Sequence, residues 1–198
     1  MSRSVAYVGL GTNLGDRRRN LESALAALAS TPGIEVAATS TIIETVPVGP
    51  SGQGLYLNAA ARLRTALDPR RLLEVCLAIE ADHGRDRRRE ERGGPRRLDL
   101  DLLLYDDRII DEPGLTVPHP RLHERSFVLG PLAEIAESVI HPVLGVSIEC
   151  LRARLASWSR AEYGWSTACS APGARAGPST KGPAGGPARW PGGEWSEL

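Results

Sequence analysis

The chain has 198 residues, enough for one domain of ordinary size, and its 24 basic residues balance 24 acidic residues. This balance gives no overall attraction to nucleic acid or to an anionic membrane. Of the basic residues 23 are arginine, and Lys181 is the only lysine. Because Lys181 is followed by Gly182, the chain has no Walker-type phosphate loop. The expected ordered core also lacks a lysine for protein-kinase or Schiff-base chemistry.

The three cysteines, Cys76, Cys150 and Cys169, lie far apart and form no CxxC pair. Their spacing indicates neither a disulfide framework nor a zinc site, and Cys76 is expected to be a small buried hydrophobe. No apolar run is long enough to cross a bilayer, and the first residues lack the features of a secretory signal. We therefore expect a cytoplasmic protein.

Composition changes sharply near the C-terminus, where 17 of the 23 residues from 171 to 193 are Gly, Pro or Ala. Such a stretch cannot bury enough apolar surface to offset the entropy of ordering it. We expect a working domain over residues 3–157 and a disordered tail over 158–198.

The first half of the domain predicts two strands around a helix, followed by a third strand. Residues 5–10 form an apolar run typical of a buried strand, and residues 16–30 carry apolar side chains at helical spacing. The β-branched stretch 34–45 and the alternating stretch 56–67 predict two further strands.

The second half continues with a helix and a fourth long strand. Asp68 and Pro69 mark the start of a helix that ends near Gly84. A strand is expected over 98–105 and a short one over 108–110, and helices are expected over about 125–136 and 148–156. The order predicts an α+β, ferredoxin-like βαββαβ sandwich, an antiparallel sheet with helices packed on it.

Two carboxylates stand two residues apart on the strand predicted over 98–105. Residues at this spacing share one face of a strand, so Asp99 and Asp101 project together while Leu98, Leu100 and Leu102 point into the core. Their mutual repulsion is relieved by a hard cation such as Mg²⁺. The alternative is an amphipathic strand whose acidic face is solvated.

An arginine-rich loop leads directly into this strand, with arginines at positions 85, 87, 88, 89, 92, 96 and 97. Arginine grips phosphate oxygens with two nitrogens, so the combination suits Mg²⁺-dependent phosphoryl transfer without a lysine. The loop could also be a solvated charged segment or an RNA contact. The scarcity of aromatic residues, with Phe127 the only phenylalanine, disfavours an RNA-stacking sheet.

Two further features are weaker signals. The glycines of residues 9–15 miss the dinucleotide-binding spacing by one residue and mark a strand-to-helix turn. His119 lies between Pro118 and Pro120, which fix its backbone, and is either a structural histidine or a phosphate contact.

Together these motifs resemble the 6-hydroxymethyl-7,8-dihydropterin pyrophosphokinase family. The resemblance covers residues 5–156 and is carried, in order, by GLGTNLGD, TVPVGPSGQGLYLNA, IEADHGR, GPRRLDLDLLLY and LTVPHPRLHERSFVLGPL. It implies a ferredoxin-like fold. It also implies transfer of the β,γ-diphosphate of MgATP to the hydroxymethyl group of the pterin, with release of AMP, in folate biosynthesis.

The resemblance also implies a set of site residues. Asp99 and Asp101 would hold two Mg²⁺ ions, and they would act in catalysis together with Arg85 and Arg96. The implied ATP-binding residues are Glu80, Arg85, Arg96, His119 and Arg125. For the pterin, Thr45 and Asn58 would read the edge of the ring, and Tyr56 and Phe127 would sandwich it.

The chain departs from the family pattern at Gly93, where a large residue is usual, and at Leu77, where glutamine is common. Neither departure removes a predicted metal ligand or stacking residue. ATP and the pterin are the expected partners of a monomer that needs no nucleic acid and no membrane. Three alternatives stay open: an RNA-binding module that uses residues 85–97, a phosphotransferase that forms ADP, and a degenerate relative without activity.

Overall fold

The computed structural model describes residues 3–48, 50, 52–85 and 94–158. Its elements are β1 (Ser4–Thr12), α1 (Arg17–Ser30), β2 (Ile34–Thr39), β3 (Ile43–Thr45), β4 (Tyr56–Thr65), α2 (Pro69–Asp82), β5 (Asp99–Tyr105), β6 (Ile110–Glu112), β7 (Leu115–Val117), a short 3-10 turn (Leu122–Glu124), α3 (Ser126–Ala136) and α4 (Ile148–Trp158).

The main sheet has the strand order β2-β4-β1-β5, and every neighbouring pair is antiparallel. Along the chain, α1 connects β1 to β2 and α2 connects β4 to β5. This is the predicted ferredoxin-like βαββαβ arrangement. The short strand β3 pairs with the start of β4, and β6 pairs with β7 in a separate hairpin. β1 lies at the centre of the sheet and β5 at one edge, which brings the diacid strand beside the glycine-rich one.

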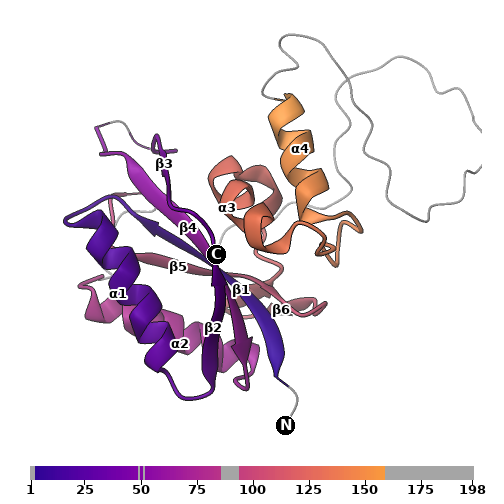
Figure 1. Cartoon of the computed structure of the whole chain (residues 1–198), viewed down its shortest axis with the longest axis horizontal. Helices are drawn as coiled ribbons and strands as arrows, with labels where there is room; N and C mark the ends of the chain where they lie inside the picture. Colours follow the sequence, from indigo (N-terminus) through magenta and orange to yellow (C-terminus); the bar gives the residue numbers. More distant parts are fainter. Residues whose placement is uncertain (1–2, 49, 51, 86–93, 159–198) are drawn as a thin grey trace, which may run out of the picture.

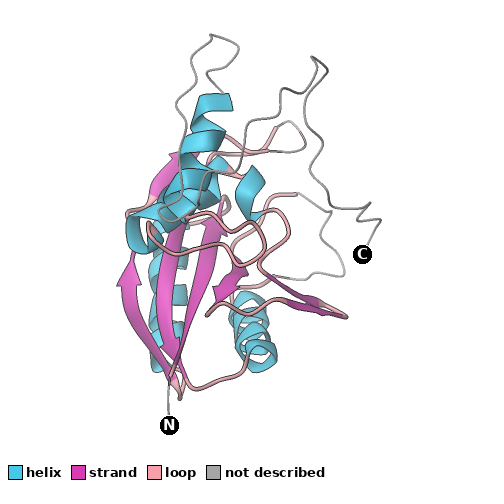
Figure 2. Ribbon diagram, turned by 90° about the vertical axis from the view of Figure 1, so that its right-hand side faces the viewer, coloured by secondary structure: helices cyan, strands magenta, loops and turns pink. Residues whose placement is uncertain are grey.

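Helices cover both faces of the sheet (Figure 1). On one face, α1 and α2 pack through residues such as Leu21, Leu28 and Leu72 against the inward side chains of β1, β4 and β5. On the other face, α3 packs through Leu129 and Leu132 over a second apolar cluster, and α4 packs against α3 and contributes Ile148 and Leu151 to the same cluster. Figure 2 shows the sheet between these two helical layers. The sheet is therefore packed by apolar side chains on both faces.

The predicted helix starts are confirmed. The Asp16 side chain accepts a hydrogen bond from the Arg19 N–H at the start of α1, and the Asp68 side chain accepts one from the Arg71 N–H at the start of α2. Cys76 is fully buried on the inner face of α2, as expected of a small hydrophobe, and burial raises the pKa of its thiol to about 12.

Two strand predictions are wrong in detail. The predicted strand 34–45 is split into β2 and β3, because the chain leaves the sheet at Thr41, where the Glu134 carboxylate accepts bonds from the Thr41 N–H and hydroxyl. The predicted strand 108–110 begins only at Ile110, because Arg108 closes a turn by donating its N–H to the Tyr105 carbonyl. The predicted tail from residue 159 onward lies outside the described residues.

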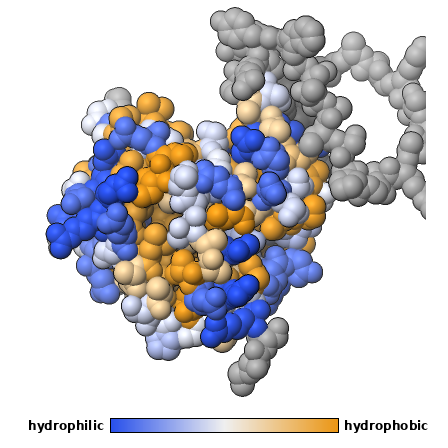
Figure 3. All heavy atoms as spheres, viewed as in Figure 1, coloured by the Kyte–Doolittle hydropathy of each residue, from blue (hydrophilic) through white to orange (hydrophobic). Residues whose placement is uncertain are grey.

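Within the part of the chain that the structure describes, no helix combines the length and apolar character needed to span a membrane. In the space-filling view of Figure 3, hydrophilic side chains gather over the outer side of α1. Arg18 and Glu22 of α1 are exposed and form an ion pair 3.8 Å long.

Candidate functional site

The diacid pair lies at the start of β5, beside glycines of β1 and above the packed core. Asp99 is paired with Gly11 and Asp101 with Gly9, while the neighbouring Leu100 is buried in the sheet. Both carboxylates project from the face covered by α3, as the alternation predicted. On the other side of β1, Gly11 is paired with Asn58 of β4.

Gly11 of β1 lies between the acidic residues of β5 and Asn58 of β4. A Cβ atom built on Gly11 would lie 3.3 Å from Oδ1 of Asn58 and 3.8 Å from Cβ of Asp99. The absent side chain therefore leaves open the space between Asn58 and Asp99. The sequence had marked this glycine only as part of a turn.

Two of the predicted phosphate-binding arginines meet at Asp99. Arg85 donates to Oδ1 of Asp99 at 2.5 Å, and Arg96 donates to Oδ2 at 2.8 Å. Both guanidinium groups are largely buried, with side-chain exposures of 8% for Arg85 and 17% for Arg96. Coulomb attraction is weakly screened there, so the three charged groups hold one another firmly.

Glu80 anchors this network from the end of α2. Its carboxylate, 1% exposed, accepts the backbone N–H of Leu100 at 2.7 Å and the guanidinium of Arg85 at 2.6 Å. β5 is an edge strand, so a side chain rather than another strand satisfies this N–H group. The structure thus places Glu80 behind Arg85, and its predicted contact with nucleotide stays a prediction.

A second group of side chains surrounds Asp101. Its Oδ2 atom lies 3.7 Å from Nη1 of Arg125 and 3.9 Å from Nε2 of His119. Burial, together with the neighbouring Asp99 carboxylate, raises the pKa of Asp101 above its ordinary range. The Arg125 guanidinium lowers the pKa of Asp101 in part. A cation bound at the site would lower this pKa further and so favour the ionised carboxylate.

His119 is held in one tautomer. Its backbone N–H donates to the Leu103 carbonyl at 2.9 Å. On the imidazole ring, Nδ1 accepts the backbone N–H of Arg121 at 3.1 Å. The ring proton of the neutral form is therefore on Nε2, on the side of Asp101. Burial, with a smaller contribution from Arg125, lowers the pKa of His119 to about 4, so the ring is a neutral donor at pH 7.

The predicted pterin residues come from three elements. Asn58 of β4 donates from Nδ2 to the Thr45 hydroxyl of β3 at 2.8 Å, and Asn58 is only 6% exposed. The Tyr56 hydroxyl lies 3.1 Å from the Gly94 carbonyl and 3.2 Å from Oε1 of Gln53. Phe127, the second residue of α3, has the Arg125 guanidinium 5.7 Å from its ring centroid. The stacking of a pterin between Tyr56 and Phe127 stays a prediction.

Sequence reasoning did not single out Asn13, which ties the site together. This residue, 7% exposed, accepts the Arg96 N–H on Oδ1 at 2.7 Å and donates from Nδ2 to Oε1 of Gln53 at 3.1 Å. Its own N–H donates to the Arg96 carbonyl at 3.0 Å. The available signal was a polar residue directly after a buried strand. It lies in the segment 9–15, whose glycine spacing does not match the dinucleotide-binding pattern.

The donor set fits a hard divalent cation that arrives with a nucleotide. Asp99 and Asp101 offer carboxylate oxygens on one face, and these are ligands that Mg²⁺ prefers. Over the described residues, no group of three or more His, Cys, Asp or Glu side chains is placed to hold a metal ion. Two carboxylates leave most positions of an octahedral ion to other oxygens, such as those of phosphate. The predicted loop arginines 87, 88, 89 and 92 lie outside the described residues.

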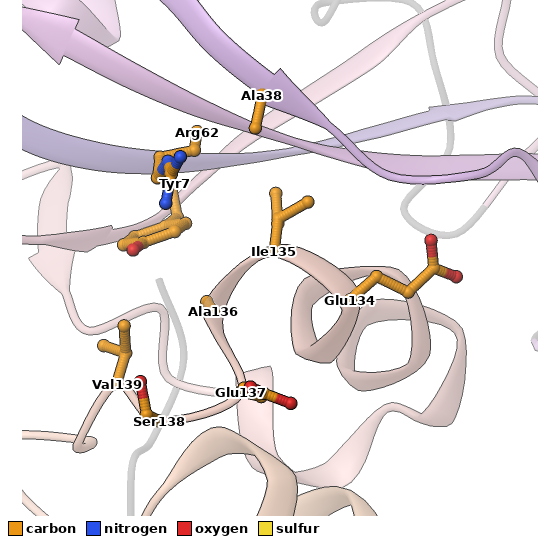
Figure 4. Close-up of a pocket in the computed structure, with 9 residues that line it drawn as sticks. All are labelled: Tyr7, Ala38, Arg62, Glu134, Ile135, Ala136, Glu137, Ser138 and Val139. Carbon is orange, nitrogen blue, oxygen red and sulfur yellow. The ribbon is translucent and has the colours of Figure 1, made fainter.

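A separate hollow of about 350 Å³ lies at the other end of α3 (Figure 4). It is lined by side chains of the sheet, including Tyr7 and Arg62, and by the last turn of α3 and the residues after it. None of the predicted site residues lines it. α3 therefore separates this hollow from the cluster around Asp101, which it approaches with its N-terminal end.

Comparisons with known proteins identify the family. Residues 7–137 match the family model of 7,8-dihydro-6-hydroxymethylpterin-pyrophosphokinase. The 2-amino-4-hydroxy-6-hydroxymethyldihydropteridine pyrophosphokinase of Methylorubrum extorquens is 48% identical over 135 residues, which are 68% of this chain and 84% of the relative. The enzyme of the same name from Bacillus subtilis is 46% identical over 136 residues, or 69% and 80% of the two chains.

Solved structures share the fold. A crystal structure of an HPPK-DHPS protein in complex with substrates superposes with a TM-score of 0.67 at 13% identity, over 82% of this chain and 45% of that one. The HPPK-DHPS triple mutant of Plasmodium falciparum with STZ-DHP gives a TM-score of 0.65 at 16% identity, over 81% and 45%. This chain thus spans less than half of these longer proteins. With the family model matched over most of the described domain, the chain belongs to the 7,8-dihydro-6-hydroxymethylpterin-pyrophosphokinase family.

Proposed function

We propose that this chain transfers the β,γ-diphosphate of ATP to the hydroxymethyl group of 6-hydroxymethyl-7,8-dihydropterin and releases AMP. It is then an ATP-dependent pyrophosphokinase of folate biosynthesis. Family membership supports the reaction, and one structural observation carries it: the Asp99 and Asp101 carboxylates lie among Arg85, Arg96, Arg125 and His119. This arrangement matches a highly charged phosphate chain with its cation.

In this reaction the hydroxymethyl oxygen gives up its proton to water and bonds to the β-phosphorus, the bond between that phosphorus and the α,β-bridging oxygen breaks, and AMP leaves with the bridging oxygen. Arg85 and Arg96 would move from Asp99 to the phosphate oxygens and offset the charge that develops there. Arg125 and the neutral His119 would donate to phosphate oxygens from the other side. With Nδ1 engaged by the Arg121 N–H, His119 is a donor and not a general base.

Asp99 and Asp101 would hold Mg²⁺, and we propose two ions. Bound there, the metal supplies Lewis-acid polarisation of phosphate oxygens and of the attacking hydroxyl group. Asn58 and Thr45 would recognise the polar edge of the pterin, since their side chains already bond to each other in a buried position. Tyr56 and Phe127 would stack on its two faces. Glu80 would position Arg85 beside β5 through its bond to the Arg85 guanidinium.

We also propose that the enzyme is a cytoplasmic monomer without a nucleic-acid or membrane partner. The balanced charge of the chain supports this, since it gives no general attraction to polyanions. Size-exclusion chromatography with light scattering at several concentrations tests the oligomeric state. A mass near 21.2 kDa is expected for the full chain.

The reaction is tested by separating the nucleotides formed from ATP, Mg²⁺ and the pterin. AMP that forms only when the pterin is present supports diphosphate transfer. ADP in place of AMP would indicate transfer of a single phosphoryl group. An absence of turnover in well-folded protein would indicate a degenerate relative, and salt-sensitive RNA binding unaffected by Asp99→Ala would favour the RNA-binding module.

A further inference from the structure

Arg17, the first residue of α1, bridges the two ends of the loop between β3 and β4. Its Nη1 atom donates to Oε1 of Glu44 at 2.8 Å and to the Leu55 carbonyl at 2.8 Å. Glu44 belongs to β3, and Leu55 directly precedes β4. A single guanidinium nitrogen thus joins the chain before the loop to the chain after it. In Figure 1 the N-terminal end of α1 lies on the same side of the molecule as this hairpin.

The residues next to these two contacts are the predicted pterin residues. Thr45 follows Glu44, Tyr56 follows Leu55, and the two face each other in the pairing of β3 with β4. That pairing extends over only three positions, so backbone hydrogen bonds alone fix the stem of the hairpin weakly. Within the loop, Val46 and Val48 are 72% and 70% exposed and add little packing. A side-chain link across the stem therefore has an unusually large share in setting its geometry.

The neighbouring Arg18 does not share this position. The Asp16 cap fixes the start of α1, so that Arg17 points toward the hairpin while Arg18 forms its 3.8 Å ion pair with Glu22 on the exposed side. The Arg17 side chain is 32% exposed, against 69% for Arg18. Two arginines adjacent in sequence thus differ in the one respect that matters here, contact with the hairpin.

We propose that Arg17 is a positioning residue for the pterin site, which sets the spacing of Thr45 and Tyr56 by joining Glu44 to the Leu55 carbonyl. The role rests on the proposed function, because it assigns pterin recognition to this hairpin. Arg17 contacts neither of the acidic residues at the start of β5 in the described structure. Its loss should consequently weaken pterin recognition and leave nucleotide binding intact.

The test compares Arg17→Gln with Arg18→Gln, which removes the same charge one residue away. Arg17→Gln is expected to raise the KM for the pterin about fivefold to tenfold, as for a partly exposed charged hydrogen bond. The kcat and the Kd for a non-hydrolysable ATP analogue with Mg²⁺ should change less than about twofold. Arg18→Gln should match wild type in all three. Glu44→Gln, which leaves the Leu55 contact in place, should raise the KM by a smaller factor.

Hydrogen exchange provides a readout that does not depend on turnover. Peptides covering residues 43–58 should exchange faster in Arg17→Gln than in wild type, whereas Arg18→Gln should leave them unchanged. An unchanged pterin KM, or an equal loss of nucleotide binding, would overturn the proposal. If the wild-type protein shows no pterin-dependent AMP, the proposed function fails, and the exchange data still decide whether Arg17 holds the hairpin.

Discussion

The guanidinium of Arg96 donates to Oδ2 of Asp99 at 2.8 Å, from a position three residues earlier in the chain. Arg85 donates to the other oxygen of the same carboxylate. A cation that uses Asp99 as a ligand therefore has to compete with two guanidinium groups. A phosphate chain offers those groups new partners, so nucleotide and metal are expected to bind together more tightly than either binds alone.

Arg96→Ala should strengthen the binding of a divalent cation measured without nucleotide. Removing one adjacent positive charge favours a cation by a factor of about ten in this partly buried site. Electron paramagnetic resonance of Mn²⁺, used as the probe ion, measures this affinity directly. The same variant should lose about a hundredfold or more in turnover, because it lacks a donor to the transferred group. Weaker Mn²⁺ binding in Arg96→Ala would contradict the competition.

Gly11→Ala should impair pterin binding without unfolding the protein. The new Cβ would lie 3.3 Å from Oδ1 of Asn58, so Asn58 would have to move and its bond to Thr45 would be strained. An overpacking cost of about 1–3 kcal/mol, if it falls on the pterin complex, corresponds to a pterin KM raised about fivefold to 150-fold. Gly9→Ala is the control on the same face of β1, since the three atoms nearest to its Cβ all belong to the Leu103 side chain, at 3.4 Å or more, and none to Asn58. Equal effects in the two variants would argue against a specific role of Gly11.

Glu80→Ala should destabilise the fold. It leaves the Leu100 N–H without its acceptor and removes a buried partner of Arg85, at a cost of about 2–4 kcal/mol in the free energy of unfolding. Urea unfolding measures this loss. Glu74→Ala on the exposed side of α2, where Glu74 pairs with Arg71, should cost less than about 0.5 kcal/mol. A Glu80→Ala protein as stable as Glu74→Ala would show that the anchor is unimportant.

His141 makes the free energy of unfolding depend on pH in the acid range. Burial lowers the pKa of this ring to about 4 in the folded protein, against an ordinary value of 6.5. The folded state thus binds fewer protons than the unfolded state. Its contribution is complete above pH 6.5 and falls as the pH drops from 6.5 toward 4, by on the order of 3 kcal/mol.

His141→Asn isolates this effect, because the Asn carbonyl can replace Nδ1 as acceptor for the N–H groups of Val143 and Leu144 but does not titrate. The unfolding free energy of wild type relative to His141→Asn should therefore decrease between pH 6.5 and 4. His119 titrates in both proteins and drops out of the difference. A difference that stays constant with pH would refute the assignment.

Sequence periodicity was sufficient for most of the fold, because local preference and burial agree. The alternation of Asp99, Leu100 and Asp101 predicted which residues share the acidic face of β5, and Asp68 with Pro69 marked the start of α2. It failed at Thr41, where a tertiary bond from Glu134, 93 residues away, breaks a stretch with uniform strand propensity.

The site was predicted mainly through motif resemblance, and its internal connections were not. Residue spacing shows that Asp99 and Asp101 share one face of the strand, but not that Arg85 and Arg96 donate to the two oxygens of Asp99. The roles of Asn13 and Arg17 depend on contacts between β1–α1 and segments 27 or more residues away, which only the folded chain brings together. Long-range side-chain contacts of this kind leave no period in the sequence.

The most direct test of the central claim is product analysis of Asp101→Asn beside wild type. The oxygens of Asp101 lie 3.7 Å or more from the cations around it, and its raised pKa means that ionisation costs stability, so the neutral variant should fold at least as well. With ATP, Mg²⁺ and the pterin, wild type is expected to form AMP and diphosphorylated pterin in equal amounts. The variant should be slower by about a thousandfold or more. Formation of ADP by wild type, or a near-normal rate in Asp101→Asn, would contradict diphosphate transfer at this diacid site.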